Sequence, residues 1–173
     1  MTPFGFWYLL VLIAISLVIV WLAWAQAIGA GWSPTPMKVV DRMLEFAKVS
    51  ENDTLYDLGS GDGRIVIRAA KKYGANAVGF ELDPIRVWIS RLRARSNGVG
   101  DKVRIVSSNL FDADLSQATV VSIFLTQKSN RRLKAKLMSL KQGTRVVTHT
   151  WTFDDWRPTI ADSKLQAYLY VVP

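Results

Sequence analysis

The chain has 173 residues, which is enough for one domain of ordinary size but not for two. It contains no cysteine and one histidine, so a disulfide scaffold and a cysteine nucleophile are excluded, and no metal site is expected. The net charge is +8, a balance that suits nucleic acid, acidic partners or anionic lipid. Half of the residues are apolar, and they are concentrated at the N-terminal end, because the first charged side chain is Lys38. A wholly soluble protein is therefore not expected.

Residues 6–28 form an apolar run that only Ser16 and Gln26 interrupt. As a helix these 23 residues would extend about 34 Å, enough to cross a hydrocarbon core of about 30 Å. A cleaved signal peptide is the competing interpretation, because Ala25 and Ala27 form a small-x-small cleavage pattern. The run is too long for a signal peptide, however, and no Lys or Arg precedes it. We predict that residues 1–30 are an N-terminal transmembrane anchor.

The basic residues that follow this run set its expected orientation. Lys38, Arg42 and Lys48 lie just after it, whereas only the terminal amine precedes it. By the positive-inside rule, the C-terminal part then lies on the cytoplasmic side of the membrane, or on the matrix side in a mitochondrion. We therefore expect a single-pass membrane protein, with the lipid bilayer as one of its partners.

Residues 31–50 are predicted as a linker and a helix, with Thr35 capping a helix that begins at Pro36. Residues 51–173 are predicted as an α/β domain with a doubly wound, mainly parallel sheet, because strand-like and helical runs alternate. The last strand-like run follows no helix, so it is expected to insert antiparallel. The strand-like runs are 54–58, 77–82, 103–107, 120–125, 144–150 and 166–172, and the helical runs are 63–73, 84–97 and 130–141. Such sheets bind ligands beyond the carboxyl ends of their strands.

A glycine-rich loop follows the first strand and leads directly into a helix. It runs from Asp57 to Gly63 with the sequence DLGSGDG. Gly59, Gly61 and Gly63 allow a tight turn and let a ligand approach the backbone. A dinucleotide-binding fingerprint would need glycine where this chain has Arg64, and the Gly-Lys-Ser/Thr of a P-loop is absent.

This D-x-G-x-G-x-G spacing resembles motif I of the class I S-adenosylmethionine-dependent methyltransferases, which have a Rossmann-like fold. The resemblance implies S-adenosylmethionine as the cofactor, with Asp57 organising its methionine end and the glycines passing beneath it. Glu81, at the end of the second strand, lies where the family keeps a carboxylate for the ribose hydroxyls. The segment after the third strand resembles the adenine-contacting loop, with Asn109 as a polar contact and Leu110 packing on the ring.

Other segments are similar to a short family of protein lysine methyltransferases, which has soluble archaeal members and membrane-anchored mitochondrial ones. They are residues 34–36, 39–40, 55–65, 115–121 and 143–149, so the resemblance covers the chain from Pro34 to its end. It implies a membrane-protein substrate that presents a lysine, and a lid over the cofactor made by Pro34, Thr35 and Pro36, for which a simple spacer is the alternative. Two segments depart from the family. Residues 150–153 lack the acidic residue that archaeal relatives carry beside the histidine, and residues 157–164 are short, so one strand of the terminal hairpin is expected to be vestigial.

Methyl transfer is an in-line displacement, so the protein mainly positions the acceptor and excludes water. A lysine acceptor, with a reference pKa near 10.4, must lose its proton before it attacks. The candidate catalytic residues are Thr126, after the fourth strand, and His149 and Trp151, after the fifth; Asp154, Asp155 and Trp156 follow on the same loop. Structural roles at a strand end or under the loop are the alternative for each. The predicted cofactor-binding residues are Pro34, Thr35, Pro36, Asp57, Gly59, Ser60, Gly61, Gly63, Glu81, Asn109 and Leu110.

The leading hypothesis is a membrane-anchored methyltransferase that modifies lysine in a membrane-associated protein. Methylation of a lipid or small molecule, and a non-catalytic subunit of a membrane complex that retains the fold, remain as alternatives. The basic residues of the helical runs 84–97 and 130–141 are expected to be a solvated face, or to attract anionic lipid if the domain is anchored. Nucleic acid is not expected as a partner.

Overall fold

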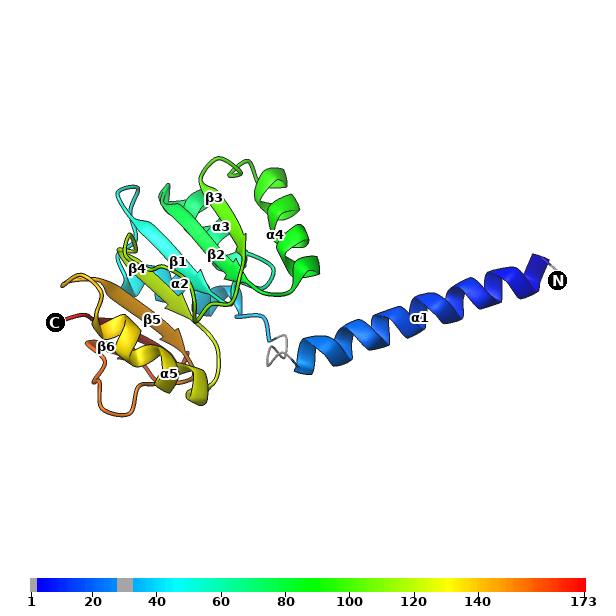
Figure 1. Ribbon diagram of the computed structural model, residues 1–173. Helices are drawn as coiled ribbons and strands as arrows, with labels where there is room; N and C mark the ends of the chain where they lie inside the picture. The colour runs from blue at the N-terminus through cyan, green and yellow to red at the C-terminus, as the bar shows by residue number, and fades with distance from the viewer. Residues whose placement is uncertain (1–2, 28–32) are drawn as a thin grey trace. The chain divides into compact units, whose positions relative to one another are not determined.

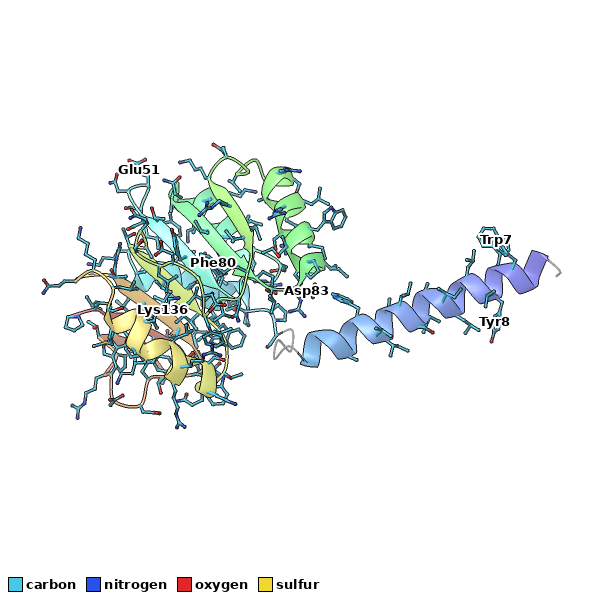
Figure 2. The ribbon with its side chains drawn as sticks, viewed as in Figure 1. Trp7, Tyr8, Glu51, Phe80, Asp83 and Lys136 are labelled. Carbon is cyan, nitrogen blue, oxygen red and sulfur yellow. The ribbon has the colours of Figure 1, made fainter. Side chains whose placement is uncertain are left out.

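A computed structural model describes residues 3–27 and 33–173 of the chain. The chain divides into two compact units, Met1–Ser33 and Pro34–Pro173. The first contains one helix, α1 (Pro3–Ala27), from which Trp7 and Tyr8 project as exposed side chains (Figure 2). Within the described ranges, no helix was found with both the length and the apolarity that crossing a membrane requires. The anchor predicted for residues 1–30 thus gains no support here and stays a prediction.

The second unit is built on a seven-stranded sheet in the order β3-β2-β1-β4-β5-β7-β6 (Figure 1). Strands β1 to β5 are mutually parallel, whereas β7 is antiparallel to both β5 and β6. The predicted doubly wound sheet, with its last strand inserted antiparallel, is confirmed. The strands are β1 (Thr54–Leu58), β2 (Asn76–Glu81), β3 (Val103–Ser107), β4 (Val120–Ile123), β5 (Arg145–His149), β6 (Ile160–Asp162) and β7 (Ala167–Val171).

Apolar side chains fill both faces of this sheet and give the unit three layers. On one face α2 (Met37–Phe46), α3 (Arg64–Tyr73) and α4 (Pro84–Ser96) bury side chains such as Met43 and Val66. On the other face α5 (Gln127–Met138) buries Leu133 and Leu137, beside apolar side chains from the segment between β3 and β4. Parallel strands that are covered on both faces are apolar throughout, which explains why their runs could be recognised in the sequence.

Three local features differ from the sequence-based prediction. The α2 helix begins at Met37, and no side chain caps it, so the cap predicted for Thr35 is wrong. The α5 helix begins three residues earlier than predicted, because the Thr126 side chain accepts a hydrogen bond from the Ser129 amide and caps it. The terminal hairpin does keep both strands, but β6 has only three residues.

The α2 helix lies in the same unit as the sheet, where it packs against β5, β7 and α3. Its buried face, which includes Val40 and Leu44, explains this attachment. The exposed face of α2 is also held against α3, since Arg68 of α3 donates to both carboxylate oxygens of Asp41 at 2.8 and 3.0 Å. As a result, residues 34–36 are held at the start of a packed helix.

Candidate active site

The glycine loop after β1 lies at the carboxyl edge of the sheet, where Asp83 is also found, whereas Glu51 lies at the opposite edge (Figure 2). The amides of Gly59 and Ser60 both donate to the Phe80 carbonyl at 2.9 Å, which joins the loop to the end of β2. Gly61 has a φ of +55°, a left-handed conformation that L side chains rarely adopt. The loop thus brings a bare backbone to the end of two neighbouring strands.

The α4 helix supports this loop from the side. The Ser90 hydroxyl donates to the Gly61 carbonyl at 2.7 Å. Asp62 is paired with Arg64 at 2.8 Å and also with Arg93 of α4. These contacts fix the loop before any ligand binds, and preformed backbone donors bind with little cost of reorganisation.

Glu81 connects three segments through its buried carboxylate. One oxygen, Oε2, accepts from the Gly61 amide at 2.8 Å, and Oε1 accepts from the amides of Leu82 at 3.0 Å and Asp83 at 2.9 Å. A carboxylate offers about four acceptor positions, so these three bonds leave about one for a ribose hydroxyl. The residue expected to hold the cofactor therefore also shapes the loop that would contact it.

Asp57 is buried at the end of β1 and accepts a hydrogen bond of 2.5 Å from the Ser122 hydroxyl of β4. Burial raises the pKa of this carboxyl to about 7, and the charges of Glu81 and Asp62 act in the same direction, while the bond from Ser122 opposes them. A cationic group beside Asp57 would favour its ionised form. The methionine end of S-adenosylmethionine carries such a group, so the position fits the role expected for Asp57.

The segment 108–111, predicted to contact adenine, is fixed by its own turn and by α5. Asn109 Oδ1 accepts from the Phe111 amide at 3.1 Å. From α5, which Figure 2 marks with Lys136, the Lys136 ammonium donates to the Phe111 carbonyl at 2.7 Å. Leu110 lies beside the glycine loop, because a Cβ built on Gly59 would come within 3.8 Å of its side chain. The structure thus brings the predicted adenine loop to the predicted methionine loop.

The hydroxyls of Ser60 and Ser108 are buried at this edge with no hydrogen-bond partner among the described residues. Buried polar atoms are normally satisfied, so two orphaned hydroxyls beside a bare glycine backbone are a signature of a ligand site. The residues present therefore fit S-adenosylmethionine. Glu81 and Asn109 are the residues expected to hold its nucleoside, and Asp57 is expected to hold its methionine end.

The segment of Pro34, Thr35 and Pro36 is attached to the glycine loop by one bond. The Arg64 guanidinium donates to the Thr35 carbonyl at 2.9 Å while it pairs with Asp62. In the sequence, Arg64 excludes a dinucleotide fingerprint and belongs to the family-like segment 55–65, but neither observation predicts this contact. Arg64 directly follows Gly63, the last glycine of the loop, and this position in the sequence is the feature that could have indicated a contact with a neighbouring segment.

The three candidate catalytic residues lie at the ends of β4 and β5. His149 Nδ1 lies 3.1 Å from the Gln166 carbonyl, and the imidazole contacts the Phe124 ring at a tilt of 46°, with 4.5 Å between ring centroids. Because a carbonyl only accepts, Nδ1 carries the proton, and in the neutral ring Nε2 is left as an acceptor. The Thr126 hydroxyl is engaged in capping α5, so for this residue the structural role is the one observed.

An unusual backbone conformation positions Trp151. Thr150 has a φ of +65°, and the Trp151 amide donates to the His149 carbonyl at 2.8 Å, as in a γ-turn. The buried Asn130 amide group of α5 donates to the Trp151 carbonyl at 2.9 Å. The indole itself is 41% exposed. Strained backbone of this kind is often found at functional sites. The contact of Asn130 could not be predicted, because nothing in a helical run indicates which amide side chain faces inward.

The three later candidates on this loop have structural partners. Asp154 accepts from Gln127 and Arg131, each at 2.8 Å, and Asp155 pairs with Lys134. The rings of Trp156, Phe153 and Tyr170 pack together with centroid distances of 5.0 to 5.2 Å. Together these contacts hold the loop on α5. His149 and Trp151 stay as the predicted acceptor-side residues.

The strand order, the glycine loop and the buried carboxylates at its edge are those of a class I S-adenosylmethionine-dependent methyltransferase. A crystal structure described as an RNA methyltransferase from Salinibacter ruber in complex with S-adenosyl-L-homocysteine superposes with a TM-score of 0.79. It is 47% identical in sequence, and the match covers 82% of this chain and 94% of that one. The chain belongs to the family of the ANTKMT methyltransferase domain, which matches residues 57–160. It is thus a methyltransferase with S-adenosylmethionine as its cofactor.

Relatives with curated names are lysine methyltransferases. A protein-lysine N-methyltransferase of Saccharolobus islandicus (strain REY15A) is 46% identical over 147 residues, which cover 80% of this chain and 91% of that protein. A lysine N-methyltransferase of Homo sapiens, named for one of the ATP synthase subunits, is 38% identical over 126 residues, or 72% of this chain. This chain spans only 53% of the human protein.

We expect Gly61→Arg to abolish binding of S-adenosylmethionine, because a side chain at this left-handed position would strain the loop and disturb the hydrogen bonds of Gly61 with Glu81 and Ser90. Gly143→Arg is the matched control, since Gly143 is also left-handed, with a φ of +84°, but has open space around its Cβ position and lies outside the site. Isothermal titration calorimetry measures both. Unchanged affinity in Gly61→Arg would contradict the assignment of the loop.

Cofactor affinity should rise with pH through the titration of Asp57. With a pKa of about 7, the carboxyl is ionised in roughly a tenth of molecules at about pH 6 and in roughly three quarters at about pH 7.5. Because a cationic ligand prefers the ionised form, binding should tighten about eightfold over this range and release a proton at the lower pH. Titration calorimetry in buffers of different ionisation enthalpy measures both quantities. Asp57→Asn should remove the slope; the same slope in that variant would assign it to another group.

Proposed function

We propose that this chain is a membrane-anchored protein-lysine N-methyltransferase that acts on a membrane-associated protein. The observation that carries the proposal is an exposed indole, Trp151, held beside His149 at the same sheet edge as the cofactor loop. In the described residues 33–173, no inserted domain covers this edge. A shallow site of this kind suits a flexible lysine stem that reaches in from another protein better than a small metabolite that must be enclosed.

The names of relatives support this substrate class. The Saccharolobus islandicus relative is named as a protein-lysine N-methyltransferase. Others are named for the ATP synthase and, in a Mus musculus protein 31% identical to this chain, for the adenine nucleotide translocase. These are properties of those proteins, and they favour a lysine in a membrane-associated protein as the acceptor here.

The geometry of the acceptor side suggests how the reaction is assisted. The amine must arrive neutral, and Nε2 of His149 is the acceptor that could take its proton or a hydrogen bond from it. The indole of Trp151 would line the stem of the lysine, while Asn130 keeps its backbone in place. When bound, S-adenosylmethionine supplies the methyl group as an electrophile. The protein contributes position and the exclusion of water.

The proposed anchor rests on the sequence of α1. No charged residue occurs before Lys38, and the large apolar side chains described from Phe6 to Val20 are exposed. Placed in a bilayer, these side chains would be removed from water. The basic residues that follow favour a catalytic domain on the cytoplasmic or matrix side.

Three alternatives to this proposal predict different outcomes of a methylation assay. Methylation of a lipid or small molecule remains open, and so does RNA, because the similar Salinibacter ruber structure is described as an RNA methyltransferase. A non-catalytic subunit would not need the buried carboxylates of Asp57 and Glu81, because burying a carboxylate that binds no ligand only lowers the stability of the fold. The site features therefore favour an active enzyme.

The acceptor class can be tested with radiolabelled S-adenosylmethionine, the full chain and native membranes from its own source, fractionated into protein, lipid and RNA. We expect label in protein as methylated lysine, with activity rising from about pH 7 to about pH 9 as the amine loses its proton. His149→Ala and Trp151→Ala should lower kcat at least tenfold with cofactor affinity nearly unchanged, whereas Glu81→Ala should weaken the cofactor. Label in lipid or RNA alone would replace the lysine proposal, and cofactor binding without any label would favour the non-catalytic alternative.

The anchor is tested by a protein that begins at residue 31. Residues Pro34–Pro173 form a compact unit with its own hydrophobic core, so this unit is expected to fold without α1. We expect the shortened protein to bind S-adenosylmethionine normally but to methylate membrane-embedded targets at least tenfold more slowly, because a tether raises local concentration. Initial rates on native membranes and on a detergent-solubilised target measure the difference. Equal rates of the two forms on membranes would show that α1 serves another purpose.

A further inference from the structure

The α4 helix is apolar on two opposite faces. Its inner face buries Val87, Ser90 and Ala94 within the domain. Its outer face also carries large apolar side chains, and with one residue that precedes the helix they form what we call the α4 stripe. The α4 stripe consists of Leu82, Ile85, Trp88 and Leu92, which are 44%, 43%, 65% and 52% exposed. Positions 85, 88 and 92 are spaced as i, i+3 and i+7, so they lie on one side of the helix.

Other helices of this unit show a different outer surface. The α3 helix exposes Lys71 and Lys72, and α5 exposes Arg131 and Arg132. Among the described residues 33–173, the exposed large apolar side chains number eight, and the α4 stripe holds four of them. Clustered exposed apolar residues that include a tryptophan mark a contact surface more often than scattered ones do. Figure 1 shows that α4, which carries the stripe, lies beside β3, the edge strand of the sheet.

The charges around the stripe indicate what it contacts. The α4 sequence contains four arginines and no Asp or Glu from Pro84 to Ser96, and Arg91 and Arg95 are exposed beside the stripe. A second copy of the chain is disfavoured as the occupant, because it would bring these arginines together on a protein of net charge +8. Tryptophan and arginine next to aliphatic side chains are the composition of helices that lie in the interface of anionic membranes.

We propose that the α4 stripe lies in the headgroup region of an anionic bilayer and holds the second unit on the membrane surface. Trp88, Leu92 and Ile85 would enter the interface and Arg95 would meet lipid phosphates, whereas the Arg91 guanidinium donates to the Ile105 carbonyl at 2.7 Å. The proposal rests on the anchored location proposed above for its setting. It concerns a separate surface, and it is tested on the domain without α1.

Docking through the stripe has a consequence for the site. The stripe begins at Leu82, next to Glu81, and α4 contacts the glycine loop through Ser90 and Arg93. The sheet order places β4 and β5 on the other side of β1 from α4. A bilayer that contacts the stripe therefore leaves the acceptor-side residues, His149 and Trp151, uncovered.

The test is sedimentation of a protein that begins at residue 31 with vesicles of phosphatidylcholine alone or with added phosphatidylglycerol. We expect binding to the anionic vesicles that weakens with salt. Trp88→Ser should lower the partition coefficient at least tenfold, whereas Ile160→Ser, which removes an exposed apolar side chain from β6, should leave it within twofold. Arg95→Gln should weaken binding about fivefold, and the control Lys141→Gln, which removes the same charge elsewhere, should have a smaller effect.

Circular dichroism and cofactor titration verify that each variant is folded, and these readouts do not depend on methyl transfer. No binding to anionic vesicles by the folded domain would overturn the proposal. Equal losses in Trp88→Ser and Ile160→Ser, or binding that depends on charge alone, would also overturn it. Self-association that Trp88→Ser abolishes would assign the stripe to a second copy of the chain instead. The result of the label-transfer experiment does not depend on these vesicle measurements. The proposal of membrane docking through the stripe and the proposal of lysine methylation can therefore fail separately.

Discussion

The hydrogen bond between the Gly61 amide and the Glu81 carboxylate, at 2.8 Å, joins the loop after β1 to the end of β2. The geometry of the site depends on it. Because Glu81 also accepts from the two amides that follow it, one carboxylate sets the direction of the chain into α4 as well as the glycine loop. Asp83 then caps α4 by accepting from the Ile85 amide, and α4 returns a bond from Ser90 to Gly61. The loop, the strand end and the helix form one closed set of contacts.

This arrangement explains how a small unit makes a preformed cofactor site. The charged side chains around the loop are paired or hydrogen-bonded, as Asp62 is with Arg64 and Arg93, so they stay in place without a ligand. Asp57 differs, because its only described hydrogen bond comes from the neutral Ser122 hydroxyl. The backbone of the site is therefore held in place by these contacts, whereas the charge of the Asp57 carboxyl changes with pH near neutrality.

Most of the sheet could be predicted because its strands are short apolar runs between turn residues, and the β1 and β3 bounds agree with the prediction. The cofactor edge followed from the spacing of Asp57, the glycines and Glu81. Contacts between distant segments could not be predicted. Nothing local indicates that Arg64 reaches the Thr35 carbonyl, or that Asn130 holds Trp151. The β6 strand was missed because three residues, paired only with β7, leave no periodic pattern.

The cluster of carboxylates at the sheet edge also bears on turnover. The charges of Glu81 and Asp62 raise the pKa of Asp57, and Asp62 itself is paired with Arg64 and Arg93, so Asp57 is the carboxyl at this edge whose charge changes near neutral pH. A sulfonium donor is cationic, and the thioether left after transfer is neutral. An ionised Asp57 beside the cofactor would therefore attract the cationic donor more strongly than the neutral thioether product, which would favour exchange of the cofactor after transfer.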